Sequence, residues 1–455
     1  MKFKYKSILK SITATAVALP TFTVLSKEEE FRVGPLLGPK EDDVNVAIVG
    51  FGKEGKILTQ ACLQIPGVRF KAVCDIWHRQ TKMAKGRLKY YGHFLNHYVD
   101  YREMLDAEGD KIDCVIIATP DWMHAEIACA CMEAGKHVYC EKEMSNTLEK
   151  AREMVLCQRR TGKLLQIGHQ RRSNPRYVHA IENVIRKHRV LGRVTHAYAQ
   201  WNRAAALFET IKKEKAHVPE LTLHKYGYEN MEQFLNWRWF KKYGGGPMVD
   251  LGSHQIDLFF WAWDCCPISV TALGGADYYK RELNDNVMAL YQFKTKEGQI
   301  NRAFYQVQTT SSRGGFYEQF MGENGSMTIS EISSRGNAVQ REFRNDLHNT
   351  RLWNMFADQG LIKMPRNPRR SSLAAYGIAL DVNVSAESLK SLLPVDLLKP
   401  AHMPHLENFF NAVRKGTPLS CPAELAYESA VAVLSTNRAV AERKTIHFKP
   451  EDFRV

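Results

Sequence analysis

The segment VNVAIV (44–49) runs directly into GFGKEG (50–55), and this junction decides the fold. The apolar run predicts a buried strand, and the residues after it are expected to start a helix. In such a turn Gly50 permits the sharp bend, Gly52 lets a pyrophosphate approach the backbone, and Gly55 lets the helix pack on the strand. The free N–H groups at the helix start would hold the phosphates. The junction, with Phe51 inside it, therefore predicts a dinucleotide-binding turn.

Four further apolar runs alternate with helical stretches, at 69–74, 114–119, 137–140 and 164–168. Strands that alternate with helices in this way form a parallel sheet. After Gly168 the pattern changes to longer stretches with a period of two, at 194–201, 268–275, 286–293 and 301–308. We therefore expect an α/β protein in which a Rossmann domain over 44–166 precedes a substrate-binding α/β domain over 167–455. The second domain is expected to carry a large, open, mixed or antiparallel sheet.

Several other segments complete the expected organisation. Helices are predicted at 405–415 and 423–442, followed by a short strand at 445–448. The charged, irregular segments 204–235 and 331–372 are expected to be surface loops or insertions.

The N-terminal segment has the character of an export signal over residues 1–26. Lysines precede an apolar stretch at 12–25, and the charged, turn-rich segment 27–43 is expected to be a linker. Pro20 and several threonines dilute the apolar stretch, so the alternative is a disordered or weakly helical tail. The signal predicts an exported, periplasmic protein, and without it the protein would be cytoplasmic. No later stretch has 18 or more apolar residues, so we expect no membrane span.

Composition and charge indicate a folded globular chain. Of 455 residues, 44% are hydrophobic and 25% are charged, with a net charge of +14. The basic residues are spread along the chain, and the cluster Arg366, Arg369 and Arg370 lacks interleaved aromatic residues, so nucleic-acid binding is not favoured. The ten cysteines include no C-x-x-C pair, and we expect mostly reduced, buried thiols rather than a zinc site or disulfides.

Asp75 follows the second predicted strand, 25 residues after Gly50. An acid at this place accepts hydrogen bonds from both ribose hydroxyls and repels a 2′-phosphate. The sequence therefore favours NAD over NADP as the cofactor, although Arg79 nearby leaves some room for the phosphorylated form.

Three motifs in order after the glycine turn carry a family resemblance: ATPDWMH (118–124), AGKHVYCEK (134–142), and GGG (244–246) leading to Asp250 and His254. The chain resembles the glucose-fructose oxidoreductase, inositol dehydrogenase and MocA (Gfo/Idh/MocA) family. The resemblance implies cofactor contacts and a homo-oligomer built through the sheet of the second domain. The contacts are implied for Thr119, Pro120, His124, Glu141 and Lys142.

The resemblance also places Lys142 near nicotinamide and substrate. The family motif is E-K-P, whereas this chain has Glu143 in place of the proline. A lysine at the carboxyl end of a parallel strand can bind a reacting hydroxyl or carbonyl. Taken alone, Lys142 could instead be a solvated lysine.

Asp250 and His254 are four residues apart, which places them on one face of a helix. We expect His254 to act as acid and base, because a histidine changes charge near neutral pH. Asp250 is expected to orient it or to bind a substrate hydroxyl. The alternatives are a structural histidine and a metal pair, but the pair has no evident third ligand and would have Lys142 beside it, so we expect no metal.

Candidate substrate contacts follow the second motif. An aromatic face packs on sugar C–H groups and polar groups select hydroxyls, although core packing is the alternative for the tryptophans and an ion pair for the arginine in 168–175. His402 and His405 are expected to be surface or packing residues. The candidate contacts are Arg172, Trp201, Asn202, Trp237 and Arg238.

Together these features predict an NAD-dependent oxidoreductase that moves hydride to or from a secondary alcohol carbon of a sugar, polyol or glycoside. The alternative is a redox-neutral glycoside hydrolase or lyase that oxidises its substrate transiently, and a third hypothesis is a non-catalytic sugar- or dinucleotide-binding protein. If the protein is exported, free NAD is scarce, so we expect a tightly retained cofactor.

Overall fold

The computed structural model describes residues 42–204, 209, 217–342, 347–364 and 390–455. The predicted export signal, most of the predicted linker and the arginine cluster at 366–370 lie outside these residues. Within them, no helix combines the length and the apolar character needed to cross a bilayer. All ten cysteines are free thiols, and seven are buried.

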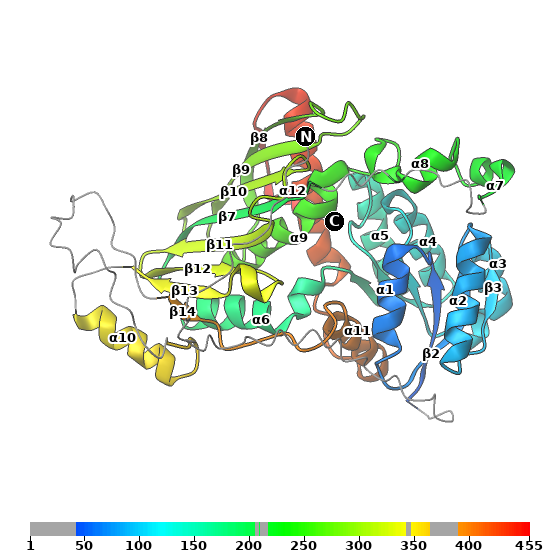
Figure 1. Ribbon diagram of the computed structural model, residues 1–455, viewed down its shortest axis with the longest axis horizontal. Helices are drawn as coiled ribbons and strands as arrows, with labels where there is room; N and C mark the ends of the chain where they lie inside the picture. The colour runs from blue at the N-terminus through cyan, green and yellow to red at the C-terminus, as the bar shows by residue number, and fades with distance from the viewer. Residues whose placement is uncertain (1–41, 205–208, 210–216, 343–346, 365–389) are drawn as a thin grey trace, which may run out of the picture.

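The first domain is a parallel six-stranded sheet with helices on both faces (Figure 1). Its strand order is β3-β2-β1-β4-β5-β6, so the order reverses between β1 and β4, where open α/β sheets bind ligands. The strands are β1 (Val44–Val49), β2 (Val68–Cys74), β3 (Asn96–Tyr98), β4 (Cys114–Ile117), β5 (His137–Cys140) and β6 (Leu165–Ile167). The helices are α1 (Lys53–Cys62), α2 (His78–Tyr90), α3 (Tyr101–Glu108), α4 (Asp121–Glu133) and α5 (Leu148–Thr161).

The second domain contains a nine-stranded mixed sheet, in the order β14-β13-β12-β11-β7-β10-β9-β8-β15. Strands β7 and β10 are parallel and the other neighbours are antiparallel. The strands are β7 (Val194–Asn202), β8 (Pro267–Gly275), β9 (Asn286–Lys294), β10 (Ile300–Gln308), β11 (Phe316–Gly322), β12 (Gly325–Ile329), β13 (Ala338–Arg341), β14 (Lys390–Leu392) and β15 (Ile446–His447). The expected α/β class with a mixed second sheet is confirmed.

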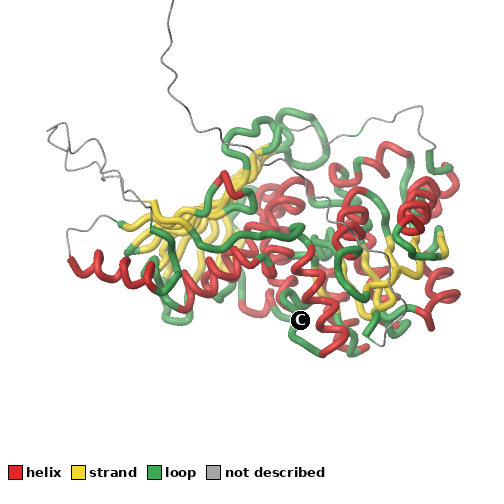
Figure 2. The backbone as a smooth tube through the Cα atoms, turned by 60° about the horizontal axis from the view of Figure 1, so that its bottom comes forward, coloured by secondary structure: helices red, strands yellow, loops and turns green. Residues whose placement is uncertain are grey.

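Helices α9 (Gly246–Trp263) and α12 (Ala423–Glu442) pack against one face of this large sheet. Figure 2 shows the helices gathered on one side of the strands. The side chains of β9 alternate accordingly, with Val287, Ala289 and Tyr291 buried and Met288 and Leu290 exposed. The period of two in the sequence thus reflects a sheet with one covered and one open face.

Two segments that the sequence suggested were irregular contain regular structure. Residues 204–235 include α7 (Glu220–Lys225) and α8 (Met231–Leu235), which lead into a 3-10 turn, η4 (Trp237–Trp239). Residues 331–372 include β13 and α10 (Leu347–Asp358). These elements are short or rich in polar residues, so their periodicity is weak. Along the chain, η2 (Gln170–Ser173) and α6 (Pro175–Val178) follow β6 and lead from the first sheet towards the second.

Helix α11 (Met403–Lys415) departs from the predicted division of the chain at residue 166. Its residues Leu406, Phe409 and Phe410 are fully buried in one cluster with Val46 and Ile48 of β1. The Rossmann core is therefore completed by a helix from the C-terminal part of the chain (Figure 1).

Candidate active site

The glycine turn after β1 has the shape that a phosphate group requires. Gly50 has a φ of +90°, and a Cβ there would lie 2.5 Å from the Ala118 carbonyl oxygen. A Cβ on Gly55 would lie 2.1 Å from the carbonyl oxygen of Gly50, so the helix can approach the turn this closely only because residue 55 is a glycine. A Cβ on Gly52 would meet nothing within 4 Å. The open space is therefore at Gly52, at the start of α1, where a pyrophosphate would bind.

Asp75 is fixed at the end of β2 by two backbone N–H groups. Its carboxylate accepts from Phe51 at 2.7 Å and from Trp77 at 2.8 Å, which leaves lone pairs on both oxygens for ribose hydroxyls. Burial raises the pKa of Asp75 to about 6, although the two N–H groups oppose the rise. The ring of Phe51 is fully buried in the core. Phe51 therefore takes part in the site through its backbone N–H, which donates to Asp75, and not through its side chain.

We expect the affinity for NAD to fall as the pH is lowered through about 6, because a protonated Asp75 loses acceptor strength for the ribose. Calorimetric titrations between pH 5 and 8 would measure this dependence. The Asp75→Asn variant is expected to bind about tenfold more weakly at pH 8 and to lose the dependence. An unchanged pH dependence in Asp75→Asn would assign the effect to another group.

The loop after β4 contributes one further polar group and one correction. The hydroxyl of Thr119 is buried and has no hydrogen-bond partner among the described residues, which fits a bound cofactor. Pro120 caps α4 with its backbone. His124 is fully buried, and its ring nitrogens lie 2.7 Å from the Glu143 carbonyl oxygen and 2.8 Å from that of Thr119. His124 therefore holds two loops together instead of offering a ring nitrogen to the cofactor.

Lys142, just after β5, is bound by Asp250 on α9. Its Nζ donates to the carbonyl oxygen of Asp250 at 2.6 Å and lies 3.1 Å from the Asp250 carboxylate, which also lies 3.3 Å from Nε of Arg238. Burial opposes the charge on Lys142, but Asp250 and Asp121 raise its pKa above the usual value. Burial likewise opposes the charge on Asp250, and the two cations hold its pKa well below the usual range. Lys142 is thus a fixed ammonium group.

This arrangement corrects the expected pairing of Asp250 with His254. Asp250 orients Lys142 and Arg238, while Nδ1 of His254 has no hydrogen-bond partner among the described residues. Burial, and then the charge of Lys142, lowers the pKa of His254 well below 6.5. His254 is therefore a neutral imidazole, and its ring can take part in hydrogen bonds with a bound substrate. Two cations on Asp250 also make it a poor metal ligand.

The candidate substrate contacts divide into two groups. Trp201 faces the site, since its ring lies 5.9 Å from that of His254 and stacks on Phe316 at 4.4 Å. Trp237 stacks on Arg238, with the guanidinium carbon 4.2 Å from the ring centre. Arg238 therefore contacts Asp250 directly, and Trp237 packs on Arg238. Trp201 packs on His254.

Arg172 and Asn202 have structural contacts instead. Arg172 is buried and forms a two-pronged ion pair with Asp257, with distances of 2.7 to 3.0 Å. Asn202 donates to the carbonyl oxygen of Arg313 at 2.8 Å and accepts from Gln306. The ion pair that was the alternative for Arg172 is therefore present, and Asp257 neutralises its charge inside the protein.

Two buried carboxyl groups beside Lys142 were missed by the sequence interpretation. Asp121 is the first residue of α4, and its side chain is buried. Burial raises the pKa of Asp121 to about 7. Burial raises that of Glu143 to about 8, and one of its carboxylate oxygens has no hydrogen-bond partner in the described part of the chain. The Lys142–Glu143 peptide bond is cis. The sequence did contain a signal for this carboxyl group, because a glutamate replaces the proline of the family motif at position 143.

Replacing Glu143 by glutamine should make the protein more stable at pH 7.5 by about 1 to 3 kcal/mol. The folded-state pKa of about 8 lies above the usual 4.5, so the folded protein keeps a proton that the unfolded chain releases. Stability is therefore lost as the pH rises from about 4.5 to about 8, and glutamine removes this loss. Urea unfolding at pH 5 and pH 7.5 measures it. Equal pH dependence in both proteins would show that Glu143 is ionised when folded.

A separate group of three side chains lies at the start of α1. Glu54, Glu141 and His402 bring one ligand atom each within 4.8 Å of one another, a spacing that could hold a metal ion. Nε2 of His402 lies 3.2 Å from the Glu54 carboxylate. Burial, and then Glu54, raises the pKa of Glu141 to about 8. His405 is a buried packing residue that contacts Ser173 and the Ile167 carbonyl oxygen, as expected.

The fold and site define a Rossmann-fold oxidoreductase with a lysine-centred site at the carboxyl edge of its parallel sheet. Family comparison agrees: residues 44–169 match the oxidoreductase family with an NAD-binding Rossmann fold, and residues 220–328 match the Gfo/Idh/MocA C-terminal domain. Together the two matches cover just over half of the chain. The chain belongs to the Gfo/Idh/MocA family, and its first domain is an NAD-binding domain.

Curated relatives match only part of this chain. An uncharacterized oxidoreductase, YrbE, of Bacillus subtilis (strain 168) is 32% identical over 131 residues, which are 29% of this chain and 36% of that protein. Glycosyl hydrolase family 109 protein 2 of Shewanella sp. (strain ANA-3) is 30% identical over 167 residues, or 34% of this chain and 36% of that protein. The chain thus spans about a third of the length of these relatives.

Solved structures share the fold over most of the chain. An NAD-binding protein from Listeria innocua superimposes with a TM-score of 0.64 at 20% identity, over 89% of this chain and 99% of that chain. A levoglucosan dehydrogenase in complex with NADH has a TM-score of 0.65 at 17% identity, over 90% and 99% of the two chains. At this identity the likeness concerns the fold.

Proposed function

We propose that this protein is an NAD-dependent oxidoreductase that transfers hydride to or from a secondary alcohol carbon of a sugar, polyol or glycoside. The observation that carries the proposal is the buried Lys142 ammonium, held by Asp250 at the carboxyl edge of β5 beside a neutral His254. This edge is where open α/β sheets bind their ligands, and the glycine turn opens onto it.

The two side chains divide the proton work between them. Oxidation of a CH–OH carbon removes hydride from carbon and a proton from oxygen, and the bound nicotinamide supplies the hydride acceptor. His254, with an unpartnered Nδ1, would accept the hydroxyl proton. Lys142 would donate a hydrogen bond to the substrate oxygen and stabilise negative charge as the C–O bond becomes a carbonyl. In the reverse direction His254 would return the proton.

We propose NAD rather than NADP because the Asp75 carboxylate, fixed by two N–H groups, would repel a 2′-phosphate. Arg79 is the residue that could favour NADP, but its guanidinium already contacts the protein, 5.8 Å from the ring of Trp77. We also propose that the cofactor stays bound through purification. Mass spectrometry of the small molecules released from native protein would test both points, and an empty protein with rapid NAD exchange would refute retention.

The direct test of the main proposal is a screen of sugars, polyols and glycosides with the purified protein and NAD. We expect reduced nicotinamide to appear with at least one of these secondary alcohols. A complete absence of reduction, with NAD shown to bind, would refute hydride transfer to free cofactor.

A second candidate is redox-neutral cleavage of a glycoside. The relatives named glycosyl hydrolase family 109 favour it, although they match only about a third of their length. In this reaction the sugar would be oxidised transiently, lose its substituent by elimination next to the new carbonyl, and then be reduced again. Incubating the protein with aryl glycosides without added NAD distinguishes the candidates, because only the redox-neutral enzyme would release aglycone over many turnovers.

The open face of the large sheet supports a proposed homo-oligomer. Leu273 is 72% exposed, and Met288 and Leu290 are each 54% exposed. Tyr198 and Phe304 stack nearby with ring centres 5.5 Å apart. An apolar patch of this kind is typical of an interface. Sedimentation analysis should show an oligomer that Leu290→Glu dissociates, and a monomeric wild-type protein would refute the proposal.

For localisation we propose export to the periplasm, on the strength of the lysine-rich start and the apolar stretch at 12–25. N-terminal sequencing of the mature protein tests this. Intact residues 1–26 on the protein in the cytosolic fraction would refute it.

A further inference from the structure

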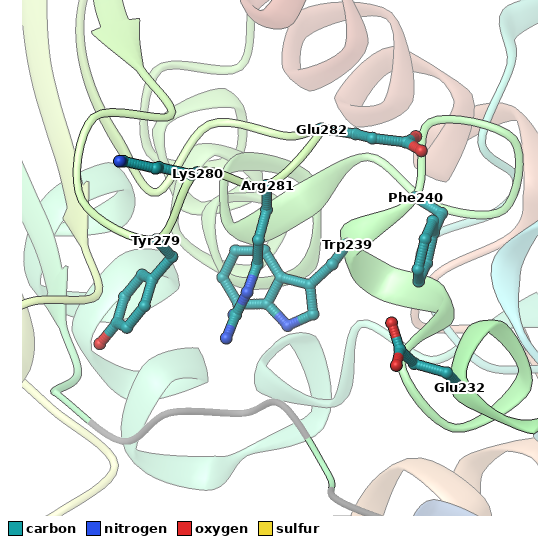
Figure 3. Close-up of a pocket in the computed structure, with 7 residues that line it drawn as sticks. All are labelled: Glu232, Trp239, Phe240, Tyr279, Lys280, Arg281 and Glu282. Carbon is teal, nitrogen blue, oxygen red and sulfur yellow. The ribbon is translucent and has the colours of Figure 1, made fainter.

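A cavity of about 380 Å³ lies beside η4, and its lining contains none of the residues assigned above to the cofactor or to the proton chemistry. Three separate segments form its wall (Figure 3). Glu232 comes from α8, Trp239 and Phe240 from η4 and the residue after it, and Tyr279 to Glu282 from the connection between β8 and β9. A volume of this size is at the lower end of the range for small-molecule sites.

A stack of three side chains forms one side of the cavity. The guanidinium carbon of Arg281 lies 4.2 Å from the ring centre of Trp239 and 4.6 Å from that of Tyr279. Figure 3 shows the Arg281 side chain lying across the indole of Trp239, with Tyr279 to one side. The Glu282 carboxylate accepts from the backbone N–H of Lys241 at 2.9 Å, which ties this connection to the segment after η4. These contacts therefore hold this wall of the cavity in a fixed position.

Trp239 supplies a polar group that this fold does not use. Its side chain is buried, with 3% exposed, and its indole N–H makes no hydrogen bond to any residue that the structure describes. A buried donor without an acceptor is costly, so such groups usually have a partner in the functional state. In Figure 3 the indole nitrogen points to the side on which the Arg281 side chain ends. A ligand oxygen in the cavity would supply the acceptor.

The charges of the wall indicate a neutral ligand. Glu232 and Glu282 offset Lys280 and Arg281, so the cavity has no net charge to attract an anion. It combines an aromatic face at Phe240, a carboxylate acceptor at Glu232 and a donor at Trp239. Hydroxyl groups both donate and accept, and the C–H face of a sugar ring packs on an aromatic ring. This set of groups fits one sugar ring.

One short turn, η4, contributes a residue to the cavity and a residue to the candidate active site. Arg238 and Trp239 are neighbours in η4, so their Cα atoms are about 3.8 Å apart. Arg238 contacts the Asp250 carboxylate that holds Lys142, whereas Trp239 lines the cavity. The turn η4 thus positions one side chain of the candidate active site and one side chain of the cavity wall.

We propose that this cavity is a subsite for a second, non-reacting sugar unit of a glycoside or oligosaccharide whose reacting carbon lies at Lys142. This inference rests on the proposed function, and it narrows the substrate class from sugars, polyols and glycosides in general to substrates of at least two units. Contacts to a remote unit can improve both binding and turnover of the reacting unit.

The test combines binding with turnover on the full-length protein. Saturation-transfer NMR with lactose, cellobiose and chitobiose, and with their monosaccharides, should show a disaccharide that binds more tightly than its components. For that disaccharide, Arg281→Ala and Trp239→Phe should each lower kcat/KM about tenfold relative to the matching monosaccharide. Trp239→Phe keeps a six-membered aromatic ring and removes the N–H together with the five-membered ring of the indole. The control is Arg102→Ala, which removes an arginine stacked on Tyr101 at 4.4 Å on α3.

The outcomes separate the two proposals. If a disaccharide binds, and Arg281→Ala weakens it but no sugar is oxidised or cleaved, the subsite stands and the proposed function fails. If sugars react but no disaccharide of the panel has an advantage, or both variants leave the advantage unchanged, the subsite is refuted and the proposed function stands.

Discussion

Replacing Lys142 by alanine is expected to lower turnover roughly 10²- to 10⁴-fold while NAD binding stays largely intact. The ammonium group is fixed by the carbonyl and carboxylate of Asp250, so it meets the substrate oxygen without reorganisation. Its removal leaves the glycine turn and Asp75 untouched. Steady-state kinetics on the substrate found in the screen, together with calorimetric titration of NAD, would measure both effects.

The matched control for this variant is Lys136→Ala. Lys136 lies just before β5, at the opposite end of the same strand, and donates to the Gly109 carbonyl oxygen at 2.6 Å. It is expected to leave turnover unchanged. If Lys142→Ala retains wild-type turnover, the assignment of the lysine-centred site is wrong.

Replacing Gly52 by alanine is expected to weaken NAD binding roughly 100-fold, or about 2.7 kcal/mol, without loss of stability. Gly52 has a φ of −69°, which alanine adopts readily, and its Cβ would meet no protein atom within 4 Å. The added methyl group would project into the space that the pyrophosphate needs. Calorimetric titration of NAD and thermal unfolding without cofactor would separate affinity from stability.

Gly86→Ala is the control, because Gly86 also has open space around its Cβ but lies within α2, away from the phosphate turn. Alanine there should leave affinity unchanged and raise stability slightly. Gly55→Ala should instead disrupt the turn itself, because its Cβ would lie against Gly50. Tight NAD binding by Gly52→Ala would mean that the pyrophosphate does not approach the backbone at this glycine.

The elements that the sequence predicted well are those whose pattern is local. Strand β1 was predicted with its observed ends because it is an almost wholly buried apolar run. Strands β9 and β10 were predicted to within one residue because burial alternates along them. β3 was missed because its three residues, Asn96 to Tyr98, are polar and lie at the sheet edge. Periodicity reveals which face of an element is apolar, but it does not reveal which partner covers that face.

The site was predicted unevenly for the same reason. Lys142 and Asp250 were both named, but their contact joins residues 108 apart in sequence, and the helical spacing suggested His254 as the partner of Asp250 instead. The role of Arg172 was left open because Asp257, its ion-pair partner, lies 85 residues away in sequence. Asp121 was overlooked because an aspartate at the start of α4 suggested an ordinary helix start.

The position of α11 has a consequence for how the chain is made. This helix follows all strands of the large sheet except β15, yet its phenylalanines lie in the same core as β1. During synthesis the nucleotide-binding half must therefore wait, with part of its interior uncovered, until the ribosome has translated the sheet domain. A clone that stops before Met403 would yield an incomplete and aggregation-prone fragment, so the two halves cannot be separated by a single cut between them.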